Sequence, residues 1–201
     1  MCGIFGFLLD SSRQFELSTE SLGVGLARIR HRGPDGTGKW VSRNGQVGLG
    51  HVRLSIIDLE TGAQPMHSAD GRYTIIYNGE IYNYIELRAE LGEDSFRTHS
   101  DTEVVLRAFE TWGVECVTRL RGMFAMAIWD AAEKRLFLTR DRFGIKPFYW
   151  AQTTGGLYFA SEIKALLPFL ENRAVSRAAL SDYFTFQFCL GEKTLMDGVW
   201  Q

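Results

Sequence analysis

Short apolar runs separated by polar turn residues follow one another along most of the chain, and this pattern predicts an architecture rich in β-strands. The first run, over residues 1–9, is apolar up to Asp10 and predicts a buried strand that begins at the chain terminus itself. Seven further segments are short, rich in β-branched or aromatic residues and bounded by Gly, Asp or Pro. These predicted strands span 39–42, 46–57, 73–78, 122–130, 135–140, 147–151 and 156–160.

Helical periodicity interrupts the strands at several places and is clearest over residues 101–112. There Ser100-Asp101-Thr102-Glu103 has the form of a capping box, apolar residues recur on one face, and Gly113 follows as a stop signal. Strand blocks separated by helices predict a layered α+β fold, and the even composition along the chain predicts one domain. The other predicted helices span 19–30, 82–91, 162–170 and 177–186.

Composition and charge narrow the class of protein. The 201 residues are 45% hydrophobic and 23% charged, which predicts a globular domain rather than a disordered chain. The net charge of −2, from 22 basic and 24 acidic residues, provides no broad basic field for nucleic acid or an anionic membrane. No apolar stretch approaches the roughly 18 residues of a membrane span, and the start lacks the basic region of a signal peptide. The sequence therefore predicts a cytoplasmic protein.

Cys2 is a candidate nucleophile because loss of the initiating Met1 would make it the N-terminal residue. A terminal cysteine carries a thiol and a free α-amine, and that amine is able to accept the thiol proton directly or through a water. Gly3 has no side chain and leaves room for a carbonyl group to approach. An incidental cysteine at the second position is the plainer interpretation of Cys2 alone. Four histidines are alternative bases for the thiol, namely His31, His51, His67 and His99.

Asn78 and Gly79 lie in the stretch Tyr77-Asn78-Gly79-Glu80, at the end of a predicted strand. An Asn-Gly pair in that place is first of all a turn signal. The same two residues also offer a side-chain amide and a main-chain N–H. Such donors are able to bind the oxyanion that develops when a nucleophile attacks a carbonyl carbon. The residues alone leave both interpretations open.

Arg53 and Asp101 are charged residues at positions that suggest a ligand. Arg53 lies in an apolar predicted strand, where a buried guanidinium needs a partner, either a structural carboxylate or the carboxylate of a substrate. Asp101 begins the predicted helix 101–112, where it favours the helix dipole or holds the ammonium group of a substrate. Together with a thiol and oxyanion donors, these charges suit a free amino acid with a side-chain amide.

Other features carry weaker signals. The glycine-rich segment 33–38 lacks the ending of a phosphate-binding loop and is interpreted as a turn that borders a pocket. The charged segment 140–147 is interpreted as a salt-bridged turn, in preference to an interface with another domain. Cys116 and Cys189 are interpreted as packing residues, since three scattered cysteines do not make a disulfide framework. No group of side chains has the spacing of a metal site.

Seven short stretches along the chain together point to one family. They are Met1-Cys2-Gly3-Ile4, Arg30-His31-Arg32-Gly33-Pro34-Asp35, Arg53-Leu54-Ser55-Ile56-Ile57-Asp58, Gly62-Ala63-Gln64-Pro65-Met66, Tyr77-Asn78-Gly79-Glu80-Ile81-Tyr82-Asn83, Ser100-Asp101-Thr102-Glu103 and Arg140-Asp141-Arg142-Phe143-Gly144-Ile145-Lys146-Pro147. In this order the sequence resembles the glutaminase domain of class II glutamine amidotransferases, of the asparagine synthetase (glutamine-hydrolysing) type. Each stretch is weak alone, whereas seven in the family's order are specific.

The resemblance implies an N-terminal nucleophile hydrolase fold, a four-layer αββα sandwich with two antiparallel sheets. It implies that Cys2, after loss of Met1, is the catalytic nucleophile, and that Asn78 and Gly79 form the oxyanion hole. The implied reaction converts glutamine and water into glutamate and ammonia through a γ-glutamyl thioester. The residues implied to bind glutamine are Arg53 for the α-carboxylate, the backbone of Ile56 and Ile57 beside it, Asn78 and Gly79 for the amide, and Glu80 and Asp101 for the α-amine.

The resemblance also implies a second domain, which binds ATP and Mg and activates aspartate or another carboxylate that receives the ammonia. Residues 2–190 are predicted to be the glutaminase domain. Residues 191–201 are predicted to be the truncated start of the connection to a missing synthetase domain, which acts in cis or in trans. No cofactor is expected in the glutaminase domain itself, and a homodimer is compatible with the resemblance. Tyr77 before Asn78-Gly79 favours the asparagine synthetase branch, since the phosphoribosyl and hexosamine branches usually have histidine there.

Other functions stay open at this stage. A non-catalytic fragment would bind glutamine or a partner chain without turnover. A related half-enzyme would supply ammonia to a carboxylate acceptor other than aspartate. A different N-terminal nucleophile amidase would act on other amides, but Arg53 and Asp101 fit a zwitterionic substrate better.

Overall fold

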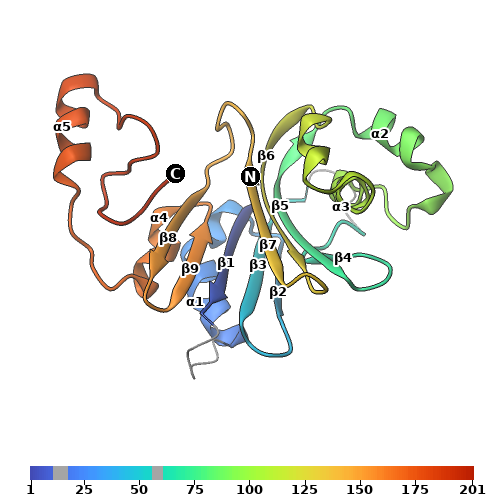
Figure 1. Ribbon diagram of the computed structural model, residues 1–201, viewed down its shortest axis with the longest axis horizontal. Helices are drawn as coiled ribbons and strands as arrows, with labels where there is room; N and C mark the ends of the chain where they lie inside the picture. Colours follow the sequence, from blue (N-terminus) through green and yellow to red (C-terminus); the bar gives the residue numbers. More distant parts are fainter. Residues whose placement is uncertain (11–17, 56–60) are drawn as a thin grey trace.

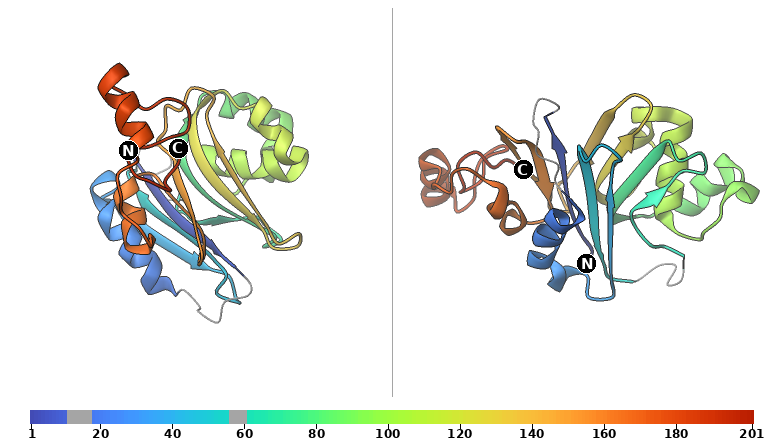
Figure 2. Two further views of the ribbon diagram at one scale, coloured as in Figure 1. Left: turned by 60° about the vertical axis from the view of Figure 1, so that its left-hand side comes forward. Right: turned by 90° about the horizontal axis from the view of Figure 1, so that it is seen from below.

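Two β-sheets packed face to face form the centre of the molecule, and helices cover the outer face of each sheet (Figure 1). The computed structural model describes residues 1–10, 18–55 and 61–201. Figure 2 shows from two further sides that α1 lies outside one sheet, whereas α2 and α3 lie outside the other. The predicted four-layer α+β sandwich with two antiparallel sheets is therefore confirmed.

The larger sheet has five strands in the order β2-β3-β1-β9-β8, and every neighbouring pair is antiparallel. Strand β1 lies at its centre, between β3 and β9, so the start of the chain is held on both edges. Such a terminus is fixed instead of frayed. The strands are β1 (Gly3–Leu9), β2 (Gly36–Val41), β3 (Val47–Arg53), β8 (Tyr149–Thr153) and β9 (Gly156–Ala160).

The smaller sheet has the order β4-β5-β6-β7 and is also antiparallel. Its strands are β4 (Met66–His67), β5 (Tyr73–Ile81), β6 (Gly122–Asp130) and β7 (Arg135–Arg140). Asn78 lies opposite Ala125 and Gly79 opposite Phe124, well inside β5. The interpretation of Asn78-Gly79 as a turn is therefore wrong. A Cβ atom on Gly79 would lie 2.5 Å from the Met123 carbonyl oxygen, so glycine here permits close strand pairing.

The helices begin and end at local signals. The Ser100 Oγ accepts the Thr102 N–H at 3.1 Å at the start of α3, and the helix ends at Gly113, whose φ is +58°. No helix in the described ranges is long and apolar enough to cross a membrane. The helices are α1 (Thr19–Arg28), α2 (Tyr84–Leu91), α3 (Asp101–Trp112), α4 (Ile163–Leu166) and α5 (Arg177–Phe186), with 3₁₀ segments at Arg30–Arg32, Glu93–Ser95, Gly113–Thr118 and Leu167–Phe169.

Successive side chains along each strand point to opposite faces of the sheet, and the apolar ones form three layers. In β1, Phe5 packs toward α1, whereas Ile4 packs between the two sheets with Ile76 of β5 and Phe159 of β9. A separate cluster lies between the smaller sheet and α3. The inter-sheet layer becomes polar toward one end, where His51 and Asn78 are buried. Apolar packing thus fixes the two sheets against each other, and the polar end is where a site is expected.

The predicted elements agree with the structure to within a few residues, apart from specific ends. The predicted strand 46–57 stops at Arg53, and its last two positions lie outside the described residues. The predicted helix 162–170 is divided between α4 and a 3₁₀ segment that contains a proline. The two-residue strand β4 and the short 3₁₀ segments carry no pattern long enough to be predicted.

The C-terminal segment lies beside the larger sheet (Figure 1). Trp200 and Trp150 of β8 exchange two main-chain hydrogen bonds, each 2.9 Å. Val199 is buried in the cluster that includes Phe5. Helix α5 carries several exposed aromatic side chains, among them Phe184. The domain boundary between residues 190 and 191 stays a prediction.

Candidate active site

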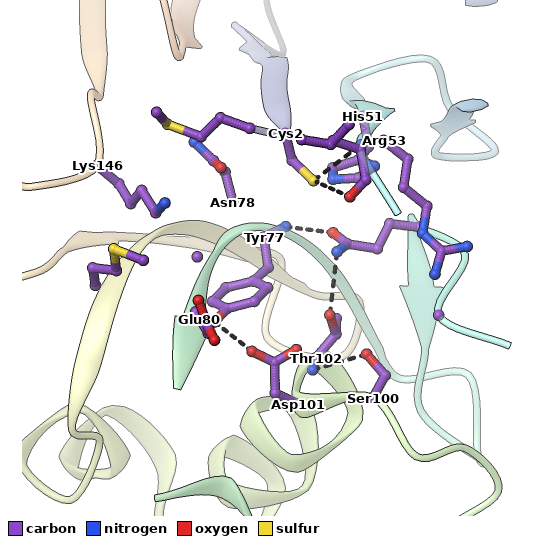
Figure 3. Close-up of a pocket in the computed structure, with 16 residues that line it drawn as sticks. Cys2, His51, Arg53, Tyr77, Asn78, Glu80, Ser100, Asp101, Thr102 and Lys146 are labelled. Atoms are coloured by element: carbon purple, nitrogen blue, oxygen red, sulfur yellow. Dashed lines mark hydrogen bonds between the residues drawn. The ribbon is translucent and has the colours of Figure 1, made fainter. Parts of the chain in front are cut away.

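A cavity of about 120 Å³ opens at the polar end of the sandwich, between β3 and β5 and beside the start of β1 (Figure 3). A cavity of this volume has room for several water molecules and therefore for a small metabolite. The lining includes each predicted site residue that the structure describes: Cys2, Arg53, Asn78, Gly79, Glu80 and Asp101. Ile56 and Ile57 lie outside the described residues, so their predicted part in the site stays a prediction.

The Cys2 thiol is held at the start of the central strand. The Arg32 Nε donates to the Cys2 carbonyl oxygen at 2.9 Å, and the Ile4 N–H donates to the Ser161 Oγ at 3.0 Å. The sulfur donates weakly to the Leu54 carbonyl oxygen at 3.5 Å and accepts the Leu54 N–H at 3.4 Å. The thiol is therefore placed by the Leu54 backbone, together with the Arg32 and Ser161 side chains that hold the start of β1.

The Glu162 carboxylate fixes Arg32, the arginine that hydrogen-bonds to the Cys2 carbonyl oxygen. Glu162 accepts hydrogen bonds from the Arg32 Nη1 and the His31 Nε2, both at 2.9 Å. Burial alone would raise the pKa of Glu162, but hydrogen bonds from Lys164, Arg32 and His31 lower that pKa to about 2. Glu162 is therefore ionised at neutral pH and keeps Arg32 against the Cys2 carbonyl.

Asn78 presents an unsatisfied donor to the pocket. The residue is 1% exposed, and its Nδ2 has no hydrogen-bond partner among the described residues. A buried polar group without a partner costs about 1–3 kcal/mol, so such groups are rare in folded proteins. An acceptor on a bound ligand would satisfy the Asn78 amide. The neighbouring Gly79 also lines the pocket.

His51 is the one histidine of the described residues that lines this pocket. Burial and the nearby Arg53 lower its pKa to about 3, although a hydrogen bond to the Tyr77 backbone opposes the shift. A base with this pKa holds a proton poorly at neutral pH, so His51 is a weak acceptor for the Cys2 proton. The histidine alternative that the sequence left open therefore loses its support. His51 instead ties the two sheets together next to the thiol.

Asp101 projects from the start of α3 toward the pocket floor. Its Oδ2 accepts the Tyr77 hydroxyl at 2.8 Å and the Ile81 N–H at 3.1 Å. Burial raises the pKa of Asp101, and these hydrogen bonds oppose that effect. Burial and the adjacent Asp101 also raise the pKa of Tyr77 well above its usual value, so Tyr77 stays a donor. The carboxylate is thus oriented by neutral donors, without a cation at its side within the described residues.

Two cationic side chains lie at opposite sides of the pocket. In Figure 3 the Arg53 guanidinium and the Lys146 side chain lie on either side of the Cys2 thiol. Arg53 is the last residue of β3, and its carbonyl oxygen accepts the Asp35 N–H at 3.0 Å. The predicted turn 33–38 is in part strand β2, and its start packs against Arg53 instead of lining the cavity.

Sequence reasoning missed some pocket residues. The Gln64 Oε1 accepts the Tyr77 N–H at 2.6 Å, and the Gln64 Nε2 donates to the Thr102 Oγ1 at 3.2 Å. Gln64 thereby ties α3 to β5 beneath the pocket. Its signal was its place in the matching stretch 62–66. Lys146 lies in segment 140–147, which is interpreted from the sequence as a salt-bridged turn.

No group of three or more His, Cys, Asp and Glu side chains within the described ranges is arranged to hold a metal ion. The chemistry of the pocket is instead that of a thiol, an unsatisfied amide, two carboxylates and two cations. The fold and this site define a class of two-sheet proteins that present a cysteine at the start of the central strand. The fold is similar to that of a solved glutamine phosphoribosylpyrophosphate amidotransferase from B. subtilis, with a TM-score of 0.67 and 23% sequence identity. That similarity covers 82% of this chain and 43% of the solved chain.

The chain belongs to the glutamine amidotransferase domain family, whose pattern matches residues 1–201. It is 43% identical over 202 residues to asparagine synthetase [glutamine-hydrolyzing] 1 of Bacillus subtilis (strain 168), covering 97% of this chain and 31% of the relative. It is also 43% identical over 171 residues to asparagine synthetase B [glutamine-hydrolyzing] of Escherichia coli (strain K12), covering 84% of this chain and 30% of the relative. The chain therefore spans about a third of the length of these curated relatives.

Proposed function

We propose that this chain hydrolyses the side-chain amide of glutamine and releases glutamate and ammonia, with Cys2 as the nucleophile. The observation that carries the proposal is the Cys2 thiol facing the same pocket as the unsatisfied Asn78 amide, in a member of the glutamine amidotransferase domain family. Glutamine has ten non-hydrogen atoms, which suits a cavity of about 120 Å³.

The first half of the reaction forms a thioester. After loss of Met1, the α-amine of Cys2 takes the thiol proton, and the sulfur bonds to the side-chain amide carbon (Cδ) of glutamine. The electron pair of the carbonyl moves to its oxygen, where the Asn78 amide and the Gly79 N–H act as donors. When the carbonyl reforms, the carbon–nitrogen bond breaks, and the protonated α-amine returns the proton to the leaving nitrogen, which departs as ammonia.

The second half regenerates the thiol. Water attacks the γ-glutamyl thioester, the α-amine of Cys2 takes one water proton, and the same donors stabilise the oxyanion. The carbon–sulfur bond breaks, the sulfur regains its proton, and glutamate leaves. Met1 lines the pocket and contacts Arg32, so its removal frees the amine and opens the space beside the thiol.

Charges around the pocket account for recognition of the amino-acid head. The Arg53 guanidinium pairs with the α-carboxylate, as arginine does well. Glu80 and Asp101 pair with the α-ammonium group. An incoming ammonium favours the ionised form of Asp101, whose pKa burial otherwise raises. The backbone of Ile56 and Ile57 is proposed to lie along the same head group.

The activity of the whole protein is a further part of the proposal. Relatives three times as long are named glutamine-hydrolysing asparagine synthetases, which supports a domain that supplies ammonia to a synthetase domain, in cis or in trans. The glutaminase domain uses no cofactor, whereas ATP and Mg serve the synthetase domain. Aspartate is the favoured acceptor of the ammonia. The protein acts in the cytoplasm. A homodimer is compatible with the family.

Substrate selectivity tests the proposed function. The purified chain is expected to release ammonia from L-glutamine but not from butyramide, which has an amide without the amino-acid head.

Arg53→Met is expected to lower kcat/KM for glutamine about 10- to 100-fold, mostly through KM, because a charged hydrogen-bonded pair is lost. Ammonia release at varied glutamine concentration measures kcat and KM. The control is Arg43→Met, at an exposed turn position, with unchanged kinetics.

Two results would contradict this proposal. Equal hydrolysis of butyramide and glutamine would assign the pocket to a general amidase. Calorimetric binding of glutamine with no ammonia released by the processed chain would instead assign it to a non-catalytic glutamine-binding domain.

A further inference from the structure

The turn that follows β7, residues 141–147, is fixed by its own main chain. The buried Asp141 carboxylate accepts N–H groups from Phe143 at 3.2 Å, Ile145 at 2.9 Å and Lys146 at 3.0 Å. The same carboxylate accepts the Phe124 N–H of β6 at 3.3 Å. The first three of these donors close the turn on itself, and the fourth ties it to the smaller sheet.

A second charge fixes the turn from the other direction. The Arg140 Nε donates to the Lys146 carbonyl oxygen at 2.6 Å, and the Arg140 Nη2 donates to the Gly144 carbonyl oxygen. Gly144 has a φ of +63°, a conformation that glycine adopts without strain. The predicted salt-bridged turn is therefore a turn whose charges hydrogen-bond to backbone groups instead of to each other. Its shape does not need the side chain of Lys146.

Lys146 nevertheless points inward, into the pocket (Figure 3). The residue is 7% exposed, whereas Phe143 on the same turn is 85% exposed. Within the described residues the Lys146 Nζ has no hydrogen bond, and no carboxylate oxygen lies within the 4.0 Å of an ion pair. Charged side chains are almost never buried unless they are paired. An ammonium held here by a rigid turn is a site for negative charge that arrives or forms in the pocket.

The reaction centre is where that negative charge forms. Glu80 and Asp101 line the same pocket, but neither is paired with Lys146. Arg53 lies on the other side of Cys2 and is assigned to the α-carboxylate (Figure 3). The Asn78 amide and the Gly79 N–H are neutral donors, and the Cys2 α-amine is charged only until it returns its proton to the leaving nitrogen. On this side of the described pocket, Lys146 is the side chain that brings a lasting positive charge.

We propose that the Lys146 ammonium stabilises the negative charge that forms on the Cys2 sulfur and then on the carbonyl oxygen of the substrate. The proposal rests on the proposed function for the second of these charges and on pocket geometry alone for the first. Lys146 acts through space on the reacting atoms, beside the neutral donors. A unit charge at the edge of a partly buried site changes the equilibrium or rate constant for forming such a charged state by about tenfold.

Alkylation of Cys2 by two reagents of different charge tests the inference directly. Iodoacetate and iodoacetamide transfer similar groups, but only iodoacetate carries a negative charge into the pocket. The ratio of their rate constants at Cys2, followed by peptide mass, is expected to fall roughly tenfold in Lys146→Met. Lys146→Arg is expected to keep the ratio near that of the wild type. The matched control is Lys134→Met, at an exposed lysine in the β6–β7 turn, with an unchanged ratio.

Glutamine kinetics separate a role at the reacting atoms from a role in substrate binding. Lys146→Met is expected to lower kcat about tenfold with little change in KM. A rise in KM alone would overturn the proposal, because it would place Lys146 at the substrate head. An unchanged alkylation ratio in a folded Lys146→Met or Lys146→Gln variant would also overturn it. So would loss of the folded state in both variants, which would make the side chain structural.

These readouts distinguish failure of this inference from failure of the proposed function. A wild-type chain that releases no ammonia but shows the Lys146-dependent alkylation ratio would contradict the function and support the charge at Cys2. A wild-type chain that hydrolyses glutamine with Lys146→Met unchanged in ratio and kcat would support the function and contradict the inference.

Discussion

Replacing Cys2 with alanine is expected to reduce glutamine hydrolysis by roughly 10⁴-fold or more, because the nucleophile that forms the thioester is removed. The fold is expected to remain, since Arg32 binds the Cys2 carbonyl oxygen and not its side chain. Cys2→Ser retains the shape but replaces the thiol with a much weaker nucleophile, and a loss of similar size is expected. Steady-state ammonia release measures both variants, and circular dichroism checks that they are folded.

Cys189 provides the matched control for Cys2. It is a second partly buried free thiol, whose Sγ donates to the Ala179 carbonyl oxygen at 3.8 Å, outside the pocket lining. Cys189→Ala is expected to retain full glutaminase activity. If Cys2→Ala retains more than a few per cent of wild-type turnover, the nucleophile is elsewhere and the mechanism is wrong.

Replacing Asn78 with leucine is expected to change activity and stability in opposite directions. Loss of one oxyanion donor lowers kcat by roughly 10²- to 10³-fold with little effect on KM. The free energy of unfolding is expected to stay level or rise, because the Nδ2 that lacks a partner in the described structure is removed. Kinetics with glutamine and urea unfolding of the same preparation measure the two effects.

Asn83 is the control with the opposite signature. Its side chain donates to the Arg119 carbonyl oxygen at 3.0 Å and accepts the Arg121 N–H at 2.9 Å, outside the pocket. Asn83→Ala is expected to lower stability by about 1–2 kcal/mol and to leave kcat unchanged. A loss of stability in Asn78→Leu without loss of kcat would show that the Asn78 amide is structural.

The predicted elements depend on local patterns, and their success follows the strength of those patterns. Strands β6, β7 and β9 and helices α3 and α5 have the predicted bounds, because each is flanked by turn or capping residues. Strand β5 fails at its end, where Asn78-Gly79 favours a turn locally. Pairing with β6 overrides that preference, and pairing partners far apart in sequence are not visible in a local pattern.

The functional site, like the fold, was predicted in part and missed in part. The family resemblance predicts one site from residues in separate parts of the chain, namely Cys2, Arg53, Asn78, Gly79, Glu80 and Asp101. The fold brings all six to one pocket. Lys146 was not predicted, because its inward direction depends on hydrogen bonds that the Asp141 carboxylate accepts from the turn and that Arg140 donates to it. The geometry of these hydrogen bonds has no signature in composition or spacing.

One thiol of the chain is unsuited to compete with Cys2 for an electrophile. Burial raises the pKa of the Cys116 thiol to about 12, so it is protonated at neutral pH and shielded from reagents. Covalent labelling by a glutamine analogue therefore reports on the pocket, with Cys189 as the site to check by peptide mass.

The most direct test of the central claim is intact mass after incubation with 6-diazo-5-oxo-norleucine, followed by mapping of the labelled peptide. This analogue carries the amino-acid head of glutamine and an electrophile at the position of the amide. The account predicts a chain that lacks Met1 and carries one adduct, on Cys2, with protection by glutamine. A chain without an adduct after Met1 has been removed, or with its adduct on Cys189, would contradict the claim that Cys2 is the N-terminal nucleophile of a glutamine-hydrolysing site.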